Sequence, residues 1–278
     1  MFNRSLAALV LSSFFTLLSA GESITGADRI YRETCLKAVQ DGYVFQNFRS
    51  LSDYAHVLEV GAGGDFATHL LQNGSKEVLE KMPAFQRLEE FGNPAVNFYP
   101  GIGSFSGTTL RYIAIADQMQ KFFSLPENAT AVEIGGGFGG QCFILSQLQK
   151  FSSYYIYDLP EVTPLVEKMM RSLSVSHVIC MPIQANINEE KIDLFISNYA
   201  FSECDRQTQL DYFERVIKKA DRGYLIYNQI AERVYRLDSL SPAEFINLLR
   251  KNGVQARIYS EPVLTDVDNL VIIWDKTR

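Results

Sequence analysis

Residues 133–140 read Glu-Ile-Gly-Gly-Gly-Phe-Gly-Gly, and this run says more about the fold than any other part of the chain. It begins inside Ala131–Ile134, a short run that predicts a β-strand, and it leads into a helical pattern over Gln141–Gln149. Glycines between a strand and a helix permit a tight turn and let a ligand approach the backbone closely. The first turn of the helix adds unpaired N–H groups. The run therefore predicts a ligand-binding turn.

Different patterns lie on the two sides of this turn. After Pro126 strands and helices alternate, with further strands expected at residues 154–157, 177–181, 192–197 and 223–227 and helices from residue 161 and at 207–220. This alternation favours parallel β-α-β units. The final strands, expected at 255–259 and 269–274 after a helix at 242–251, have a short connection and should pair antiparallel.

The region before the turn has a helical pattern instead. Residues 24–120 are predicted to be mostly helical with loops, including a helix at 108–123. The segment 97–112 is rich in glycine and aromatic residues, and we expect it either to form a lid or to contribute Phe98, Tyr99 and Phe105 to the core. Residues 58–64 (Leu-Glu-Val-Gly-Ala-Gly-Gly) resemble the glycine run, but no second strand with an acid follows them. They are predicted to be a turn and the start of a helix.

Two acidic residues accompany the glycine turn. Asp158 ends the next predicted strand about twenty residues further on, where a carboxylate can accept both hydroxyls of a ribose. Glu133 lies inside the first strand, where a buried charge is costly without a partner. A cationic ligand would supply that partner.

A nicotinamide dinucleotide is the main alternative ligand. Gly135, Gly137 and Gly140 have the spacing of the dinucleotide fingerprint. Such a ligand places a pyrophosphate over the turn, where the carboxylate of Glu133 would repel it. The position of the motif in the middle of the chain also favours the cationic ligand.

Four motifs carry a resemblance to a known family. Residues 132–140, followed by Tyr157-Asp158-Leu159-Pro160, resemble the glycine motif and the Asp-Leu-Pro motif of small-molecule O-methyltransferases. Residues 107–112 (Gly-Thr-Thr-Leu-Arg-Tyr) and 196–203 (Ile-Ser-Asn-Tyr-Ala-Phe-Ser-Glu) extend the resemblance to the sugar O-methyltransferase family, among the class I S-adenosylmethionine-dependent enzymes. It covers residues 93–227 and implies an α/β fold, a Rossmann-like methyltransferase sheet that is parallel with an antiparallel last strand.

The change of pattern after Pro126 and the apolar N-terminus divide the chain into three expected parts. Residues 129–278 would form the Rossmann-like catalytic domain that binds S-adenosylmethionine, and residues 22–128 a helical cap or substrate region. Residues 1–21 would be a signal-peptide-like segment or an apolar N-terminal helix, because Arg4 precedes a short apolar run that ends in Ser-Ala-Gly. A signal peptide argues for export or membrane association, whereas the cofactor argues for the cytoplasm.

Cofactor-binding roles follow from the same resemblance. Glu133 would support the ammonium group of the cofactor, Asp158 would hold its ribose, and Leu159 would pack on its adenine. Gln184 to Asn186 would face the adenine amino group, and Arg111 would pair with the carboxylate of the cofactor or else form a surface ion pair. The remaining cofactor contacts would be Gly135, Gly136, Gly137, Gly139, Ser197 and Asn198.

Catalysis requires an oxygen nucleophile aligned with the methyl group and, for a weakly acidic sugar hydroxyl, a general base. Related enzymes place a histidine after the fourth strand, and this chain has none there. Glu203 is our first candidate for the base and Asp205 the second, and Tyr199 would orient the hydroxyl. Glu203 alternatively stabilises the N-terminus of the next helix.

Composition limits the other functions that need consideration. The net charge of −6 argues against a general nucleic-acid binder. The four cysteines form no Cys-x-x-Cys pair, so we expect no metal site. The leading hypothesis is transfer of a methyl group to a sugar-like small molecule, with a homodimer through the N-terminal helical region. The alternatives are an NAD(P)-dependent oxidoreductase and a non-catalytic protein that kept the methyltransferase fold.

Overall fold

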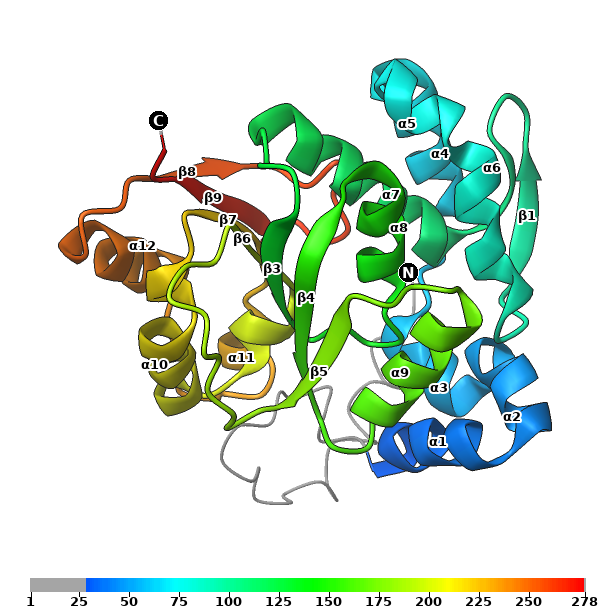
Figure 1. Cartoon of the computed structure of the whole chain (residues 1–278), viewed down its shortest axis with the longest axis horizontal. Coiled ribbons are helices and arrows are strands. Elements are labelled where there is room, and N and C mark those ends of the chain that lie inside the picture. The colour runs from blue at the N-terminus through cyan, green and yellow to red at the C-terminus, as the bar shows by residue number, and fades with distance from the viewer. Residues whose placement is uncertain (1–28, 278) are drawn as a thin grey trace, which may run out of the picture.

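A computed structural model describes residues 29–277 of the chain (Figure 1). The interpretation of residues 1–21 as a signal peptide or an apolar helix therefore lies outside the described residues. None of the helices between residues 29 and 277 is long and apolar enough to cross a membrane.

A seven-stranded sheet forms the centre of the molecule, with strand order β5-β4-β3-β6-β7-β9-β8. Five strands are parallel: β3 (Ala129–Ile134), β4 (Phe151–Asp158), β5 (Val178–Pro182), β6 (Leu194–Asn198) and β7 (Arg222–Tyr227). β9 (Leu270–Asp275) runs antiparallel to β7, and β8 (Ala256–Tyr259) runs antiparallel to β9. The predicted fold, a parallel sheet with an antiparallel last strand, is confirmed.

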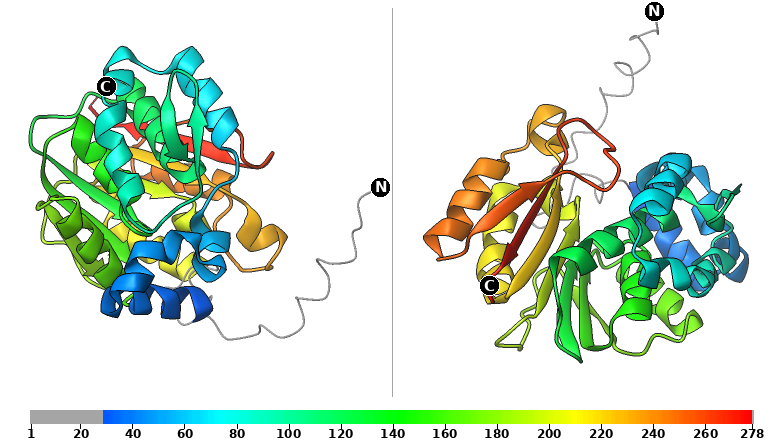
Figure 2. Two further views of the ribbon diagram at one scale, coloured as in Figure 1. Left: turned by 90° about the vertical axis from the view of Figure 1, so that its right-hand side faces the viewer. Right: turned by 90° about the horizontal axis from the view of Figure 1, so that it is seen from above.

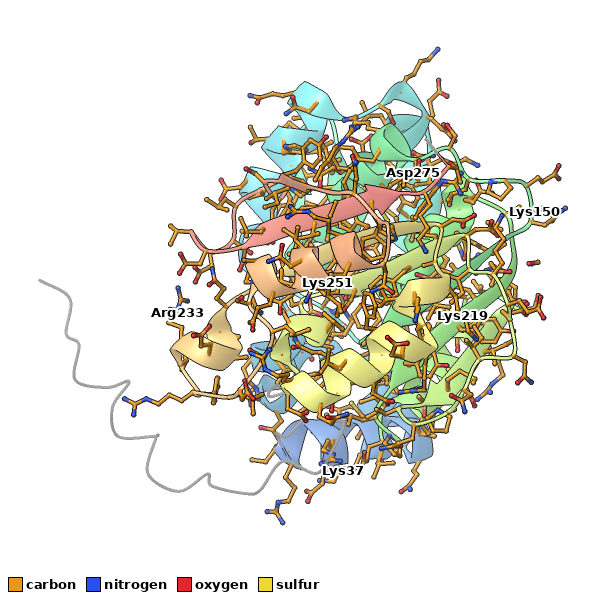
Figure 3. The ribbon with its side chains drawn as sticks, turned by 90° about the vertical axis from the view of Figure 1, so that its left-hand side faces the viewer. Lys37, Lys150, Lys219, Arg233, Lys251 and Asp275 are labelled. Atoms are coloured by element: carbon orange, nitrogen blue, oxygen red, sulfur yellow. The ribbon has the colours of Figure 1, made fainter. Side chains whose placement is uncertain are left out.

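Helices cover both faces of this sheet (Figure 1). On one face lie α7 (Gly107–Phe122), α8 (Gly140–Leu148) and α9 (Thr163–Ser172), and on the other lie α10 (Arg206–Arg215) and α12 (Pro242–Lys251). Figure 3 views the second face, where Lys219 marks the 3₁₀ turn after α10, Lys251 the end of α12, and Arg233 the short α11 (Ile230–Arg233). Because β4, β3 and β6 are neighbouring parallel strands, their carboxyl ends lie together at one open edge of the sheet.

An additional helical layer covers α7 to α9 on the side away from the sheet (Figure 2). It contains α1 (Arg29–Gln40), α2 (Gly42–Asn47), α3 (Ser52–Leu58), α4 (Gly63–Asn73), α5 (Lys76–Glu80) and α6 (Met82–Phe85). The predicted helical N-terminal region is confirmed for its described part. Leu58 ends α3, and residues 59–64 form a turn and the start of α4. Buried apolar side chains from Tyr31 to Trp274 form one continuous cluster through both regions. The domain boundary at residue 129 stays a prediction.

The segment expected to form a lid is a β-hairpin followed by the first turns of α7, and the lid stays a prediction. Residues 96–106 form a β-hairpin of β1 (Val96–Tyr99) and β2 (Gly103–Ser106), paired antiparallel. Gly101 and Gly103, with φ of 81° and 115°, make the turn, and the hydroxyl of Ser106 caps α7 by accepting from the N–H of Thr109. The hairpin forms because strand pairing satisfies backbone groups that a loose loop would leave to water.

A buried arginine connects the helical layer to the glycine turn. The side chain of Arg49 is inaccessible to solvent and pairs with Glu59 (2.6 Å) and Glu89 (3.4 Å). Its guanidinium lies 4.7 Å from the ring centroid of Phe138, which belongs to the glycine turn. The edge of Phe48 packs on the same ring.

Candidate functional site

A cavity of about 130 Å³ opens where β3, β4 and β6 end. This is the point at which the strand order reverses around β3, and open α/β sheets bind ligands at that point. The predicted site residues that line the cavity are Arg111, Glu133, Gly135, Gly136, Gly137, Asp158, Leu159, Asn198, Tyr199 and Glu203. The fold therefore brings most of the predicted cofactor and catalytic residues together.

Left-handed backbone conformations shape the glycine turn. Gly135 and Gly137 have φ of 77° and 57°, a backbone conformation that residues with a Cβ rarely adopt. A Cβ at Gly135 would lie 2.1 Å from the Cβ of Ala200, so glycine is also required for close packing against the turn after β6. The backbone N–H of Gly135 donates to the carbonyl of Tyr157 at 2.8 Å, which fixes the turn to β4.

The carboxylate of Asp158 is held by the backbone on both of its oxygens. The N–H of Gly137 donates to Oδ2 at 3.0 Å, and the N–H of Leu159 donates to Oδ1 at 2.8 Å. Burial raises the pKa of Asp158 to about 6, although these hydrogen bonds favour the charged form. Each oxygen keeps a further lone pair, so Asp158 can still accept hydrogen bonds from a ligand in the cavity.

Glu133 has a partner that the sequence analysis did not foresee. It is 1% exposed, and its Oε2 accepts a hydrogen bond from the hydroxyl of Tyr154 at 2.9 Å. Burial raises the pKa of Glu133 to about 8. The premise that this residue needs a cationic ligand is thus corrected, because protonation and Tyr154 together relieve the cost of burying it.

Arg111 presents an unpaired cation to the cavity. Its Nη2 donates to the carbonyl of Leu58 at 3.5 Å, and its guanidinium lies over the rings of Tyr112 and Tyr199. Its Nε is buried without a hydrogen-bond partner. Among the described residues no carboxylate lies within ion-pair distance, so the alternative of a surface ion pair is wrong. A buried donor without a partner is costly, and a ligand acceptor would remove that cost.

A strained turn after β6 carries the catalytic candidates. Tyr199 has φ of 75°, and its hydroxyl donates to the carboxylate of the buried Glu261. The 3₁₀ turn η4 (Ala200–Glu203) follows, and Glu203 at its end is 5% exposed and lines the cavity. Oε1 of Glu203 accepts from Nδ2 of Asn228 at 2.8 Å. Glu203 is therefore an oriented carboxyl group beside the cavity.

Two of the expected site residues have structural roles instead. Ser197 is fully buried: its hydroxyl donates to the carbonyl of Ile134 and accepts from the N–H of Phe201, so it fastens the turn after β6. Gly139 is the N-cap of α8 with φ of 87°, and a Cβ there would lie 2.7 Å from Met170. Neither residue lines the cavity.

The other three expected residues outside the cavity lie at the surface or at a helix end. Gln184 and Asn186 are exposed, because Ile183 and Ile187 on either side turn into the core. Asp205 caps α10, with its carboxylate accepting from the N–H and the hydroxyl of Thr208. It thus takes the role of stabilising a helix N-terminus that was considered for Glu203.

Five cavity-lining residues were missed by the sequence analysis. Ala200 lies within a quoted motif, and Tyr112 neighbours Arg111, so their positions were available in the sequence. Tyr31, Val57 and Leu58 come from α1 and α3, more than seventy residues before the glycine turn. Only the packing of the helical layer brings them to the site.

Comparison with known proteins shows distant structural likeness only. No protein-family model and no curated protein matches the chain. The pyocyanin biosynthetic protein PhzM is similar at 13% identity and a TM-score of 0.46, over 60% of this chain and 56% of its own, so the chain spans little more than half of that protein. An S-adenosylmethionine-dependent methyltransferase from Aquifex aeolicus is similar at 16% identity and a TM-score of 0.44, over 57% of this chain and 88% of its own. Another from Clostridium acetobutylicum is similar at 11% identity and a TM-score of 0.47, over 59% of this chain and 91% of its own. Such distant likeness assigns no function.

Proposed function

We propose that the chain is an S-adenosylmethionine-dependent O-methyltransferase that methylates a hydroxyl of a sugar or a glycosylated small molecule. One observation carries this proposal: a single cavity at the reversal point of the sheet combines the glycine turn, a backbone-held carboxylate at Asp158 and an unpaired guanidinium at Arg111. These groups complement the two ends of one ligand.

The donor fits this set of groups chemically. The free lone pairs of Asp158 suit the two hydroxyls of a ribose, and the unpaired Nε of Arg111 suits a carboxylate. Leu159, 4% exposed, offers an apolar surface to an adenine. When bound, S-adenosylmethionine supplies a methyl group activated by its positively charged sulfur. Glu133, once ionised, would stabilise the positive end of that ligand.

Binding of S-adenosylmethionine requires the cavity to widen. Ligand pockets usually measure about 300–1,000 Å³, and the cavity measures about 130 Å³. The sheet edge is fixed by strand pairing, whereas Tyr31 reaches the cavity from α1 and both Val57 and Leu58 reach it from α3. We expect these three side chains to move when the cofactor binds.

Glu203 supports a hydroxyl as the methyl acceptor. A sugar hydroxyl is a weak nucleophile, and a nearby carboxylate can take its proton during transfer. Glu203 lines the cavity and is oriented by Asn228, while Asp205 is engaged at a helix end. Glu203 is therefore the proposed general base, and Tyr199, beside it in the cavity wall, would position the acceptor. The sugar itself is supported by the sequence resemblance.

The same site is less suited to a dinucleotide. A pyrophosphate over the glycine turn would lie near the carboxylate of Asp158, and like charges repel in a site of low polarity. A protein that had only kept the fold would have no need to keep Asp158, Arg111 and Glu203 together around one cavity.

Calorimetry with the full chain tests the proposal. We expect binding of S-adenosylmethionine and S-adenosylhomocysteine and none of NAD⁺. Transfer of a radioactive methyl group from S-adenosylmethionine to a panel of monosaccharides and glycosides, followed by analysis of the product, then tests the acceptor. Binding of NAD⁺ alone would overturn the proposed cofactor, and methylation of amines alone would overturn the proposed acceptor.

A further inference from the structure

A chain of two hydrogen bonds runs from α7 through α8 to the end of β6. Nε2 of Gln141 donates to the backbone carbonyl of Tyr112 at 3.2 Å. Oε1 of the same side chain accepts from Nδ2 of Asn198 at 3.1 Å. Gln141 is 1% exposed and lies in the first turn of α8, directly after the glycine run. Gln141 does not line the cavity, whereas Asn198 does.

The direction of this chain is fixed by chemistry. A backbone carbonyl can only accept hydrogen bonds, so Gln141 has to present its NH₂ group to Tyr112. The carbonyl oxygen of Gln141 then faces Asn198, and because that oxygen can only accept, Asn198 has to present its own NH₂ group. The two amide groups therefore cannot be exchanged without breaking both hydrogen bonds.

This orientation determines where the other polar atom of the Asn198 amide, Oδ1, lies. Its Oδ1 is buried and has no hydrogen-bond partner among the described residues, although the residue lines the cavity. A buried acceptor without a partner costs about 1–3 kcal/mol. In the same cavity wall Nε of Arg111 is a buried donor without a partner. One cavity thus holds an unmet acceptor and an unmet cationic donor.

An unmet acceptor and an unmet cation together complement an α-amino acid, which carries an ammonium and a carboxylate on one carbon. We propose that Gln141 is a positioning residue, which holds the amide of Asn198 so that its oxygen accepts a hydrogen bond from the ammonium of the methyl donor. This inference rests on the proposed function, and it adds a residue that determines affinity for the amino-acid end of that ligand.

Two ligands separate this role from a general effect on the site. S-adenosylhomocysteine carries the amino-acid end, and 5′-methylthioadenosine lacks it while sharing the nucleoside. In Gln141→Leu the amide of Asn198 is free to rotate, so we expect about tenfold weaker binding of S-adenosylhomocysteine, since hydrogen bonds to charged groups contribute about 1.5–3 kcal/mol. Binding of 5′-methylthioadenosine should stay within about twofold.

A second substitution tests the mechanism by rescue. A carboxylate has an acceptor oxygen on each side and needs no orientation, so Gln141→Leu combined with Asn198→Asp should recover the affinity for S-adenosylhomocysteine. Asn198→Ala should lower the affinity for S-adenosylhomocysteine as much as Gln141→Leu does. The double variant with both substitutions should bind little more weakly than either single variant, because both substitutions remove the same interaction. Gln147→Leu, the same change on the same helix away from the cavity, is the control.

The possible results are distinguishable in calorimetry with thermal melts of each variant. Equal weakening of both ligands in Gln141→Leu, or no weakening of either, overturns the positioning role while leaving the proposed cofactor intact. Failure of Asn198→Asp to recover binding in the Gln141→Leu background also overturns it. If the unaltered chain binds neither ligand, the proposed function fails and the inference fails with it.

Discussion

The carboxyl group of Glu133 accepts a hydrogen bond from the hydroxyl of Tyr154, 2.9 Å away, between two adjacent strands of the central sheet. Both side chains are buried, and burial raises the pKa of Glu133 to about 8. The residue is thus largely protonated at neutral pH while the cavity holds no cation. A bound sulfonium or ammonium would favour its ionised form.

This pair predicts how stability depends on pH. The pKa of Glu133 rises from 4.5 to about 8 on folding, so the folded state holds a proton that the unfolded chain releases between these values. Its contribution is complete below about pH 4.5 and is lost as the pH rises through about 8. Glu133→Gln, which keeps an acceptor for Tyr154, should melt like the unaltered chain near pH 5 and several degrees higher near pH 9.

Thermal melts across this pH range provide the measurement. Glu189→Gln is the matched control, because Glu189, in the loop after β5, accepts from the hydroxyl of Tyr155 on β4 at 2.9 Å. The gain in melting temperature at high pH should be larger in Glu133→Gln than in Glu189→Gln, because Glu133 is buried and Glu189 is partly exposed. A Glu133→Gln variant that gains no stability at high pH would show that Glu133 is already ionised in the folded protein.

Asp158→Ala should weaken the binding of S-adenosylhomocysteine at least tenfold, because the ribose loses its charged acceptor. The amide groups of Gly137 and Leu159 lose their partner too, so thermal melts must show that the turn still folds. Asp211→Ala, which removes an exposed ion pair with Arg215, serves as control. Unchanged affinity by calorimetry would refute the assignment of Asp158 to the ribose.

Glu203→Gln should lower turnover about a hundredfold or more, while the affinity for S-adenosylhomocysteine stays within about twofold. The glutamine oxygen can still accept from Asn228, so the turn is kept. Asp205→Asn preserves the cap of α10 and should turn over normally. Rates near those of the unaltered chain in Glu203→Gln would exclude this residue as the base.

Arg49→Met should destabilise the protein by about 3 kcal/mol, because the partly buried carboxylates of Glu59 and Glu89 lose their buried cation. Urea unfolding measures the change. Lys76→Met removes an exposed ion pair with Glu80 and should cost less than about 1 kcal/mol. Similar losses in the two variants would mean that the Arg49 cluster contributes little more than a surface pair.

The fold and the position of the glycine turn beside Asp158 were predictable, because they depend on local patterns. Gly135 to Gly137 and Asp158 lie at strand ends that the alternation of strands and helices locates, and strand order then places them together. Glu203 and Asp205 follow the same strand, two residues apart, and only the cap of α10 shows which of them faces the cavity.

Other features depend on contacts that no local pattern encodes. Gln184 and Asn186 follow β5 as expected, but the burial of Ile183 and Ile187 turns them outward. The hydroxyl of Tyr154 reaches Glu133 because β4 pairs with β3 in one particular register. The hairpin at residues 96–106 was missed because its strands are only four residues long.

The ring of Phe138 has a practical consequence for anyone dividing this protein. It belongs to the glycine turn, yet its neighbours Phe48 and Arg49 come from the amino-terminal helical layer. A fragment begun at residue 129 would leave this aromatic surface bare and remove Tyr31 and Leu58 from the cavity rim. A shortened chain should therefore retain these helices, since the excised half would expose an apolar surface and tend to aggregate.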